Sequence, residues 1–122
     1  MTSETGPLVD ADHVADLVAL DQGKGAVFAR FVDLFVTRTP QRVAELNSYA
    51  GSGDLANLAE AAHSLRGAAG NVGAFRLAVL LGRIEAAGKT GDAAAAGEHL
   101  ALLEDEYDAT RLALLAAAKD RR

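Results

Sequence analysis

The chain has 122 residues, of which 50% are hydrophobic and 5% are aromatic, and its formal net charge is −5. It contains no cysteine, which excludes disulfides, thiolate metal sites and cysteine nucleophiles, and its negative charge argues against binding to nucleic acids. No run reaches about 18 apolar residues and no basic leader begins the chain, so we expect a cytoplasmic protein without a membrane span or a signal peptide.

The first half of the chain predicts two helices. Residues 11–20 carry a short apolar stripe and follow Asp10, a residue type that caps helix N-termini. Residues 24–49 have apolar side chains at helical spacing, which predicts a second helix. Pro40 falls within this second segment. Because proline lacks an amide donor and clashes with the preceding turn, it must either kink the helix or split it.

The third and fourth helices are predicted around a Gly-Asn pair. The third spans residues 54–69 and begins at Asp54, another N-cap candidate. Residues 70–71 are the Gly-Asn pair that ends it, because both residue types tolerate left-handed backbone. The fourth helix runs from residue 73 or 74 to residue 87, and residues 88–91 form the next turn.

A fifth helix is predicted over residues 92–118, again starting at an aspartate. Short turns between amphipathic helices favour antiparallel neighbours. The expected fold class is therefore all-α: an up-down-up-down antiparallel four-helix bundle, with the short first helix lying across one end. We place this bundle domain at residues 10–119, between a flexible N-terminus at residues 1–9 and a C-terminal tail at residues 120–122.

The core of the bundle is expected to hold the aromatic rings, although one of them could instead belong to an apolar docking patch. The four phenylalanines assigned to the core are Phe28, Phe31, Phe35 and Phe75. His13 and His99 have no notable neighbours in the sequence, so both are interpreted as ordinary histidines.

His63 lies in the third predicted helix, on the side away from its apolar face. At about 100° per residue, it projects roughly 120° from the centre of that face, which is formed by Leu55, Leu58, Ala62, Leu65 and Ala69. We therefore expect its imidazole to be exposed. An imidazole that is largely uncharged near neutral pH can accept a phosphoryl group and return it.

Two residues one turn after His63 suit such a reaction. Arg66 offers a positive charge and forked donors to an anion held on the imidazole. Gly67 costs a helix about 1 kcal/mol relative to alanine, so its presence needs a reason. Removal of side-chain bulk beside the imidazole, to admit a partner's active site, is one reason. Close packing between helices is the alternative.

The run at residues 63–74, His-Ser-Leu-Arg-Gly-Ala-Ala-Gly-Asn-Val-Gly-Ala, carries a resemblance to a known family. It resembles the signature His-Ser-Leu-Lys-Gly-Ser-Ala-Gly-Asn-Leu-Gly-Ala of histidine-containing phosphotransfer (HPt) domains. The likeness continues into the fourth predicted helix, where the family's apolar-then-glutamate pattern is matched by Leu77, Leu81, Ile84 and Glu85.

The resemblance implies that His63 is the phosphoacceptor, through its Nε2 atom, that Arg66 supports the phosphoryl group and that Gly67 clears the surface. The family usually has lysine at the position of Arg66 and often serine at the position of Ala68, so transfer rate or partner choice could differ here. The docking surface around the histidine is expected to comprise Glu60, Ser64, Gly67 and Arg76.

The same resemblance implies partners. These are the receiver domains of response regulators, or a hybrid histidine kinase, with Mg²⁺ supplied by the receiver and no cofactor or metal of the chain's own. The chain is then a monomeric phosphocarrier, not an enzyme. Because it stops at Arg122, without a dimerisation or ATP-binding domain, we do not expect it to phosphorylate itself from ATP.

Several alternatives remain open at the level of sequence. Glu60 and His63 have the Glu-x-x-His spacing of di-iron bundles, although such sites need two of these motifs facing inward. The segment also resembles the histidine domain of chemotaxis-type kinases, and a bundle that binds receivers without transfer is a third possibility. Arg66 and Arg76 could each be no more than solvated surface charges.

Overall fold

The computed structural model describes residues 6–119, and the parts of the predicted terminal segments at residues 1–5 and 120–122 lie outside this range. Within it the chain forms five helices and no strand, which confirms the all-α prediction. The helices are α1 (Ala11–Ala19), α2 (Ala26–Gly51), α3 (Leu55–Asn71), α4 (Phe75–Thr90) and α5 (Ala93–Lys119).

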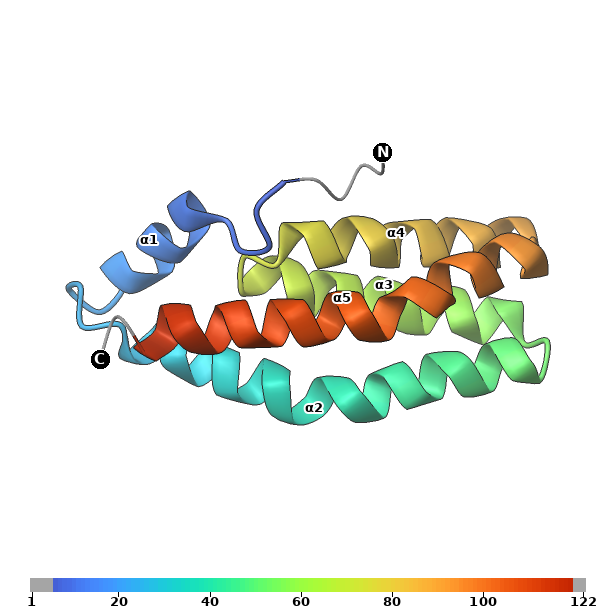
Figure 1. The fold of residues 1–122 in the computed structure, drawn as a ribbon, viewed down its shortest axis with the longest axis horizontal. Coiled ribbons are helices and arrows are strands. Elements are labelled where there is room, and N and C mark those ends of the chain that lie inside the picture. The colour runs from blue at the N-terminus through green and yellow to red at the C-terminus, as the bar shows by residue number, and fades with distance from the viewer. Residues whose placement is uncertain (1–5, 120–122) are drawn as a thin grey trace.

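The four long helices pack in a closed ring of contacts. α2 packs against α3, α3 against α4, α4 against α5, and α5 returns to α2, while α1 contacts α2. Successive long helices run in alternating directions, and α1 lies beyond the end of the group where α2 begins (Figure 1). None of the helices among residues 6–119 combines the length and the apolarity that a bilayer crossing requires.

Three aspartates cap helices as the sequence predicts. Each accepts a hydrogen bond from the backbone amide three residues later, which satisfies one of the amides that a helix N-terminus leaves unpaired. The bonds are His13 N to Asp10 Oδ1 (2.8 Å), Asn57 N to Asp54 Oδ1 (3.2 Å) and Ala95 N to Asp92 Oδ1 (3.0 Å).

Tyr107 supplies the hydrogen bond that Pro40 cannot make. In a regular helix the amide of residue 40 would donate to the carbonyl oxygen of Val36, four residues earlier. Proline has no amide hydrogen, and the Tyr107 hydroxyl on α5 donates to the Val36 oxygen instead, at 3.1 Å. Burial raises the pKa of the Tyr107 phenol above its ordinary 10.0, which keeps this donor protonated. α2 is continuous across Pro40, so of the two alternatives that the sequence leaves open, a kink or a split, the split does not occur.

The predicted ends of α3 and α4 are too early. α3 continues through Asn71, and α4 continues through Gly88 to Thr90, so the turn begins only at Gly91, whose φ of 73° is left-handed. Gly88 lies inside α4 because α3 approaches it closely. A Cβ at this position would lie 2.9 Å from the Leu55 carbonyl oxygen. Here tertiary packing outweighs the usual preference of glycine for helix ends.

The core prediction holds for two phenylalanines and is wrong for a third. Phe28 and Phe35 are buried, and Phe31 is partly buried. Phe75 is 42% exposed because it begins α4 at the surface, where its ring packs edge-on against His13 with centroids 5.2 Å apart. The His13 ring also holds the α3–α4 turn, since its Nε2 lies 3.0 Å from the Asn71 carbonyl oxygen.

Candidate functional site

His63 projects from the middle of α3 into solvent, as its helical position predicts. Its side chain is 64% exposed, whereas Leu58, Ala62 and Leu65 on the opposite face of the helix are buried. The apolar face fixes the rotation of α3 against the bundle. Core packing therefore keeps the imidazole on the outside.

A buried carboxylate from α4 holds one nitrogen of this exposed ring. Glu85 is only 6% exposed, and its Oε2 lies 3.0 Å from His63 Nδ1. A carboxylate can only accept a hydrogen bond, so this contact favours the tautomer in which Nδ1 carries the proton and donates it to Glu85. In that tautomer Nε2 keeps its lone pair.

Arg66 lies beside the same pair of groups. Its Nη2 is 3.2 Å from Glu85 Oε1 and 3.1 Å from His63 Nδ1. Once Nδ1 is protonated it cannot accept from Arg66, so the ion pair with Glu85 is the attractive contact of the two. Glu85 Oε1 makes no hydrogen bond within the described structure, and the guanidinium is the charge that faces it.

Lys89 is the third side chain that contacts the Glu85 carboxylate, after His63 and Arg66. Its Nζ lies 2.9 Å from Glu85 Oε2, one turn further along α4. The hydrogen bond from Lys89 lowers the pKa of Glu85, burial works in the opposite direction, and Arg66 and His63 lower the pKa further. The net effect is a pKa below the ordinary 4.5, so Glu85 is ionised at neutral pH.

Two glycines shape the surroundings of the ring. Apart from its chain neighbours and its own helix backbone, no atom of residues 6–119 lies within 4 Å of the place where a Cβ on Gly67 would sit, so Gly67 is not a packing glycine and leaves open space one turn from His63. Gly82 on α4 lies against Arg66, where a Cβ would make an ordinary van der Waals contact with Arg66 Cδ at 3.5 Å.

An open hollow adjoins the imidazole on the side of the α4 C-terminus. It has a volume of about 820 Å³, and Glu60, Glu85 and Lys89 line it together with His63. On the other side of α3, exposed Ser64 accepts a hydrogen bond from Arg42 of α2 at 3.2 Å. Of the sequence-predicted docking residues, Glu60, Ser64 and Gly67 therefore surround His63.

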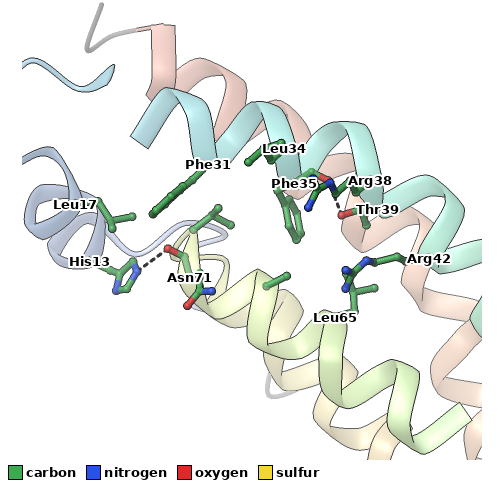
Figure 2. Close-up of a pocket in the computed structure, with 12 residues that line it drawn as sticks. His13, Leu17, Phe31, Leu34, Phe35, Arg38, Thr39, Arg42, Leu65 and Asn71 are labelled. Atoms are coloured by element: carbon green, nitrogen blue, oxygen red, sulfur yellow. Dashed lines mark hydrogen bonds between the residues drawn. The ribbon is translucent and has the colours of Figure 1, made fainter. Parts of the chain in front are cut away.

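An apolar groove runs between α1, α2 and α3. It has a volume of about 380 Å³ and includes Leu17, Phe31, Phe35 and Leu65 in its lining. Figure 2 shows His13 and Leu17 at one end of the groove, Phe31 and Phe35 along it, and Arg42 at the opposite end. Because Arg42 also bonds Ser64, the groove lies next to the surface around His63.

Arg76 is not brought to this site. It lies nine residues before Glu85, which places the two side chains on opposite sides of α4. Its guanidinium pairs with Glu106 of α5, with Nη2 3.3 Å from Oε2, and Nη1 donates to the Gly6 carbonyl oxygen at 3.3 Å.

The sequence predicts the exposed histidine but not all of the groups that contact it. Glu85 fits a sequence pattern that assigns it no role, and Lys89 falls within the turn predicted at residues 88–91. One signal was available, because Glu85 follows Leu81 by four residues and Leu77 by eight, which places it on the buried side of the helix, where charge is rarely found unpaired. Among residues 6–119, no group of three or more histidine, aspartate or glutamate side chains is arranged to hold a metal ion.

Comparisons with known proteins agree with this geometry. The Hpt domain family matches residues 30–113, well over half of the chain. Among solved structures, the crystal structure of histidine-containing phosphotransfer protein B (HptB) from Pseudomonas aeruginosa PAO1 is similar, with a TM-score of 0.85 and 24% identity. The match covers 97% of this chain and 100% of that one. The search of curated proteins gives no match.

Proposed function

The chain belongs to the Hpt domain family and so has a histidine phosphotransfer function in two-component phosphorelays, and on that premise we propose that His63 carries the phosphoryl group. The observation that supports this assignment is an imidazole 64% exposed whose Nδ1 lies 3.0 Å from a buried carboxylate. The other two histidines have no such arrangement, since His13 is bonded to the α3–α4 turn and His99 is partly buried on α5.

The transfer step follows from the tautomer. The lone pair on His63 Nε2 attacks the phosphorus of a partner's phosphoaspartate, a nitrogen–phosphorus bond forms, and the bond from phosphorus to the aspartate oxygen breaks. The electron pair of that bond leaves with the aspartate carboxylate. The ring keeps its Nδ1 proton and becomes positively charged, and Glu85 stabilises that charge through its 3.0 Å contact. The reverse sequence returns the phosphoryl group.

Arg66 and Gly67 serve the same step in different ways. In this proposal Arg66, 43% exposed, donates to an oxygen of the phosphoryl group once Nε2 carries it, and stays close to Glu85. Gly67 leaves open space beside the ring, so that a partner's phosphoaspartate can reach the nucleophile. Phosphoryl transfer depends mainly on positioning and charge stabilisation, which these residues supply.

The proposed partner is a receiver domain of a response regulator or of a hybrid kinase, which brings the aspartate and Mg²⁺. We place its docking surface on Glu60, Ser64 and Gly67 and on the adjoining groove. Apolar side chains there give contact area, and Arg38 and Arg42 at its edge complement an acidic partner surface. In this account the chain is a cytoplasmic, monomeric carrier without ATP-dependent kinase activity, built as an up-down-up-down four-helix bundle with an added N-terminal helix.

The experiment is transfer from a receiver that carries radiolabelled phosphoaspartate. Wild-type protein should acquire acid-labile, base-stable label, and His63→Gln should acquire none while its circular dichroism spectrum is unchanged. Undiminished labelling of His63→Gln would remove His63 from the reaction. For the docking surface, Leu34→Asp in the groove should weaken receiver affinity, whereas Leu112→Asp, at an exposed leucine on α5, should not.

A further inference from the structure

One oxygen of Glu85 is shared by the phosphoacceptor and by a lysine. Oε2 lies 3.0 Å from His63 Nδ1 and 2.9 Å from Lys89 Nζ, so the ammonium and the imidazole nitrogen are at most about 6 Å apart. The Lys89 side chain is 66% exposed, and its stem is long and flexible. Within residues 6–119, its ion pair is with Glu85.

Two cations flank the imidazole from opposite directions along α3. Arg66 lies one turn after His63 and takes Glu85 Oε1, whereas Lys89 approaches from the end of α4 that lies beside the start of α3. One carboxylate therefore faces two permanent positive charges. Arg66 and Lys89 are the cations near an anion that arrives at the ring, and Glu60 is the other carboxylate in the hollow.

We infer that Lys89 is a second phosphoryl-binding residue, which moves from Glu85 Oε2 to an oxygen of the phosphoryl group once Nε2 of His63 is phosphorylated. The inference rests on the proposed function of His63. Lys89 forms and breaks no covalent bond. Nδ1 of His63 keeps its proton and continues to donate to Glu85 Oε2, so this oxygen retains a donor after Lys89 has moved.

The open hollow gives Lys89 room for this movement. His63, Glu60 and Lys89 line it, and the His63 side chain, which would carry the phosphoryl group on Nε2, is 64% exposed. A phosphoryl group carries close to two negative charges and three acceptor oxygens. It therefore competes favourably with Glu85 for the Lys89 ammonium, because Glu85 has two other partners, His63 and Arg66. Glu60, across the hollow, is a negative charge that the lysine also screens.

The test loads phosphate without a partner, so that its outcome is independent of any receiver. Inorganic phosphoramidate phosphorylates histidine directly, and the phosphorus NMR signal of His63 is identified by its loss in His63→Gln. The pH titration of that signal is then compared in wild-type protein and in Lys89→Met, which keeps the apolar stem and removes the charge. A nearby cation disfavours protonation of the phosphoryl oxygens, so their proton affinity should rise about three- to fivefold in Lys89→Met.

Two further variants complete the design. Lys89→Arg should titrate like wild type, and Lys24→Met, at an exposed lysine between α1 and α2, should as well. Lys89→Met and wild-type curves that coincide would overturn the inference, and so would an equal shift in Lys24→Met. Failure of the proposed function is seen separately, as failure of a phosphorylated receiver to transfer to wild-type protein.

Discussion

The carboxylate of Glu85, buried in α4, lies 3.0 Å from Nδ1 of His63, whose side chain is 64% exposed on α3. A water-exposed nucleophile is thus oriented by a group that water scarcely reaches. Buried hydrogen-bonded charges are stronger determinants of geometry than solvated ones, because little solvent competes for them. This relationship assigns the two ring nitrogens different tasks.

Glu85 should affect transfer through both its charge and its acceptor oxygen. Glu85→Gln keeps an oxygen that can accept from Nδ1 but removes the charge, so the transfer rate should fall about tenfold. Glu85→Ala removes both and should lower the rate further. Rapid-quench measurement of transfer from a phosphorylated receiver compares the variants. Equal rates in all three proteins would show that Glu85 does not act on the ring.

The stability contributed by Glu85 should depend on pH. Its pKa is lowered in the folded protein, so its ion pairs stabilise the fold above the unfolded value of about 4.5, and this contribution is lost as pH falls through the lower folded pKa. The loss in unfolding free energy caused by Glu85→Gln should be on the order of 1 kcal/mol larger at pH 7 than at pH 3. Urea unfolding at both values measures it, and a difference independent of pH would contradict the assignment.

The exposed histidine could be predicted from sequence because it follows from local geometry. The period of the apolar face of α3 fixes which residues of that helix point outward, and His63 and Gly67 are among them. Glu85 lies 22 residues after His63, and the sequence alone does not say how α3 and α4 are rotated against each other. The residues that the sequence does not predict, Glu85 and Lys89, are therefore those that tertiary packing of α4 brings to the His63 ring.

Gly67 should separate stability from docking. Its missing Cβ faces open space, so Gly67→Leu should raise the unfolding free energy by up to about 1 kcal/mol through helix propensity. The same leucine stands where a partner must approach, so receiver affinity should fall at least about tenfold. Gly97→Leu on α5 is the matched control, because its Cβ also meets nothing and it should gain stability alone. Unchanged affinity of Gly67→Leu, measured by calorimetry, would refute the access role.

Tyr107 and Pro40 should be thermodynamically coupled. Tyr107→Phe removes the hydroxyl that donates to the Val36 carbonyl oxygen, so it should lower the free energy of unfolding by about 1–3 kcal/mol. In a Pro40→Ala background the amide of residue 40 supplies that donor, so the same tyrosine substitution should cost less. A double-mutant cycle in urea measures the difference. Additive effects would show that the hydroxyl does not compensate for the proline.

Helix ends were the least predictable part of the fold, for a physical reason. Glycine and asparagine favour helix termini on intrinsic grounds, so the sequence predicts helix ends at residues 70–71 and at Gly88. In the structure Gly88 is needed where α3 and α4 approach, and α4 therefore continues past it. Phe75 was misassigned to the core because apolarity alone does not distinguish a core ring from one that packs against His13 at the surface.

The position of the phosphorus atom in the phosphorylated protein tests the proposed role of His63 most directly. Nitrogen-15-labelled protein, phosphorylated by a receiver, is examined by long-range proton–nitrogen NMR together with mass-spectrometric mapping under alkaline conditions. We predict phosphorus on Nε2 of His63, with a proton retained on Nδ1 that donates to Glu85. Phosphorus on Nδ1 of that ring, or on His13 or His99, would contradict it.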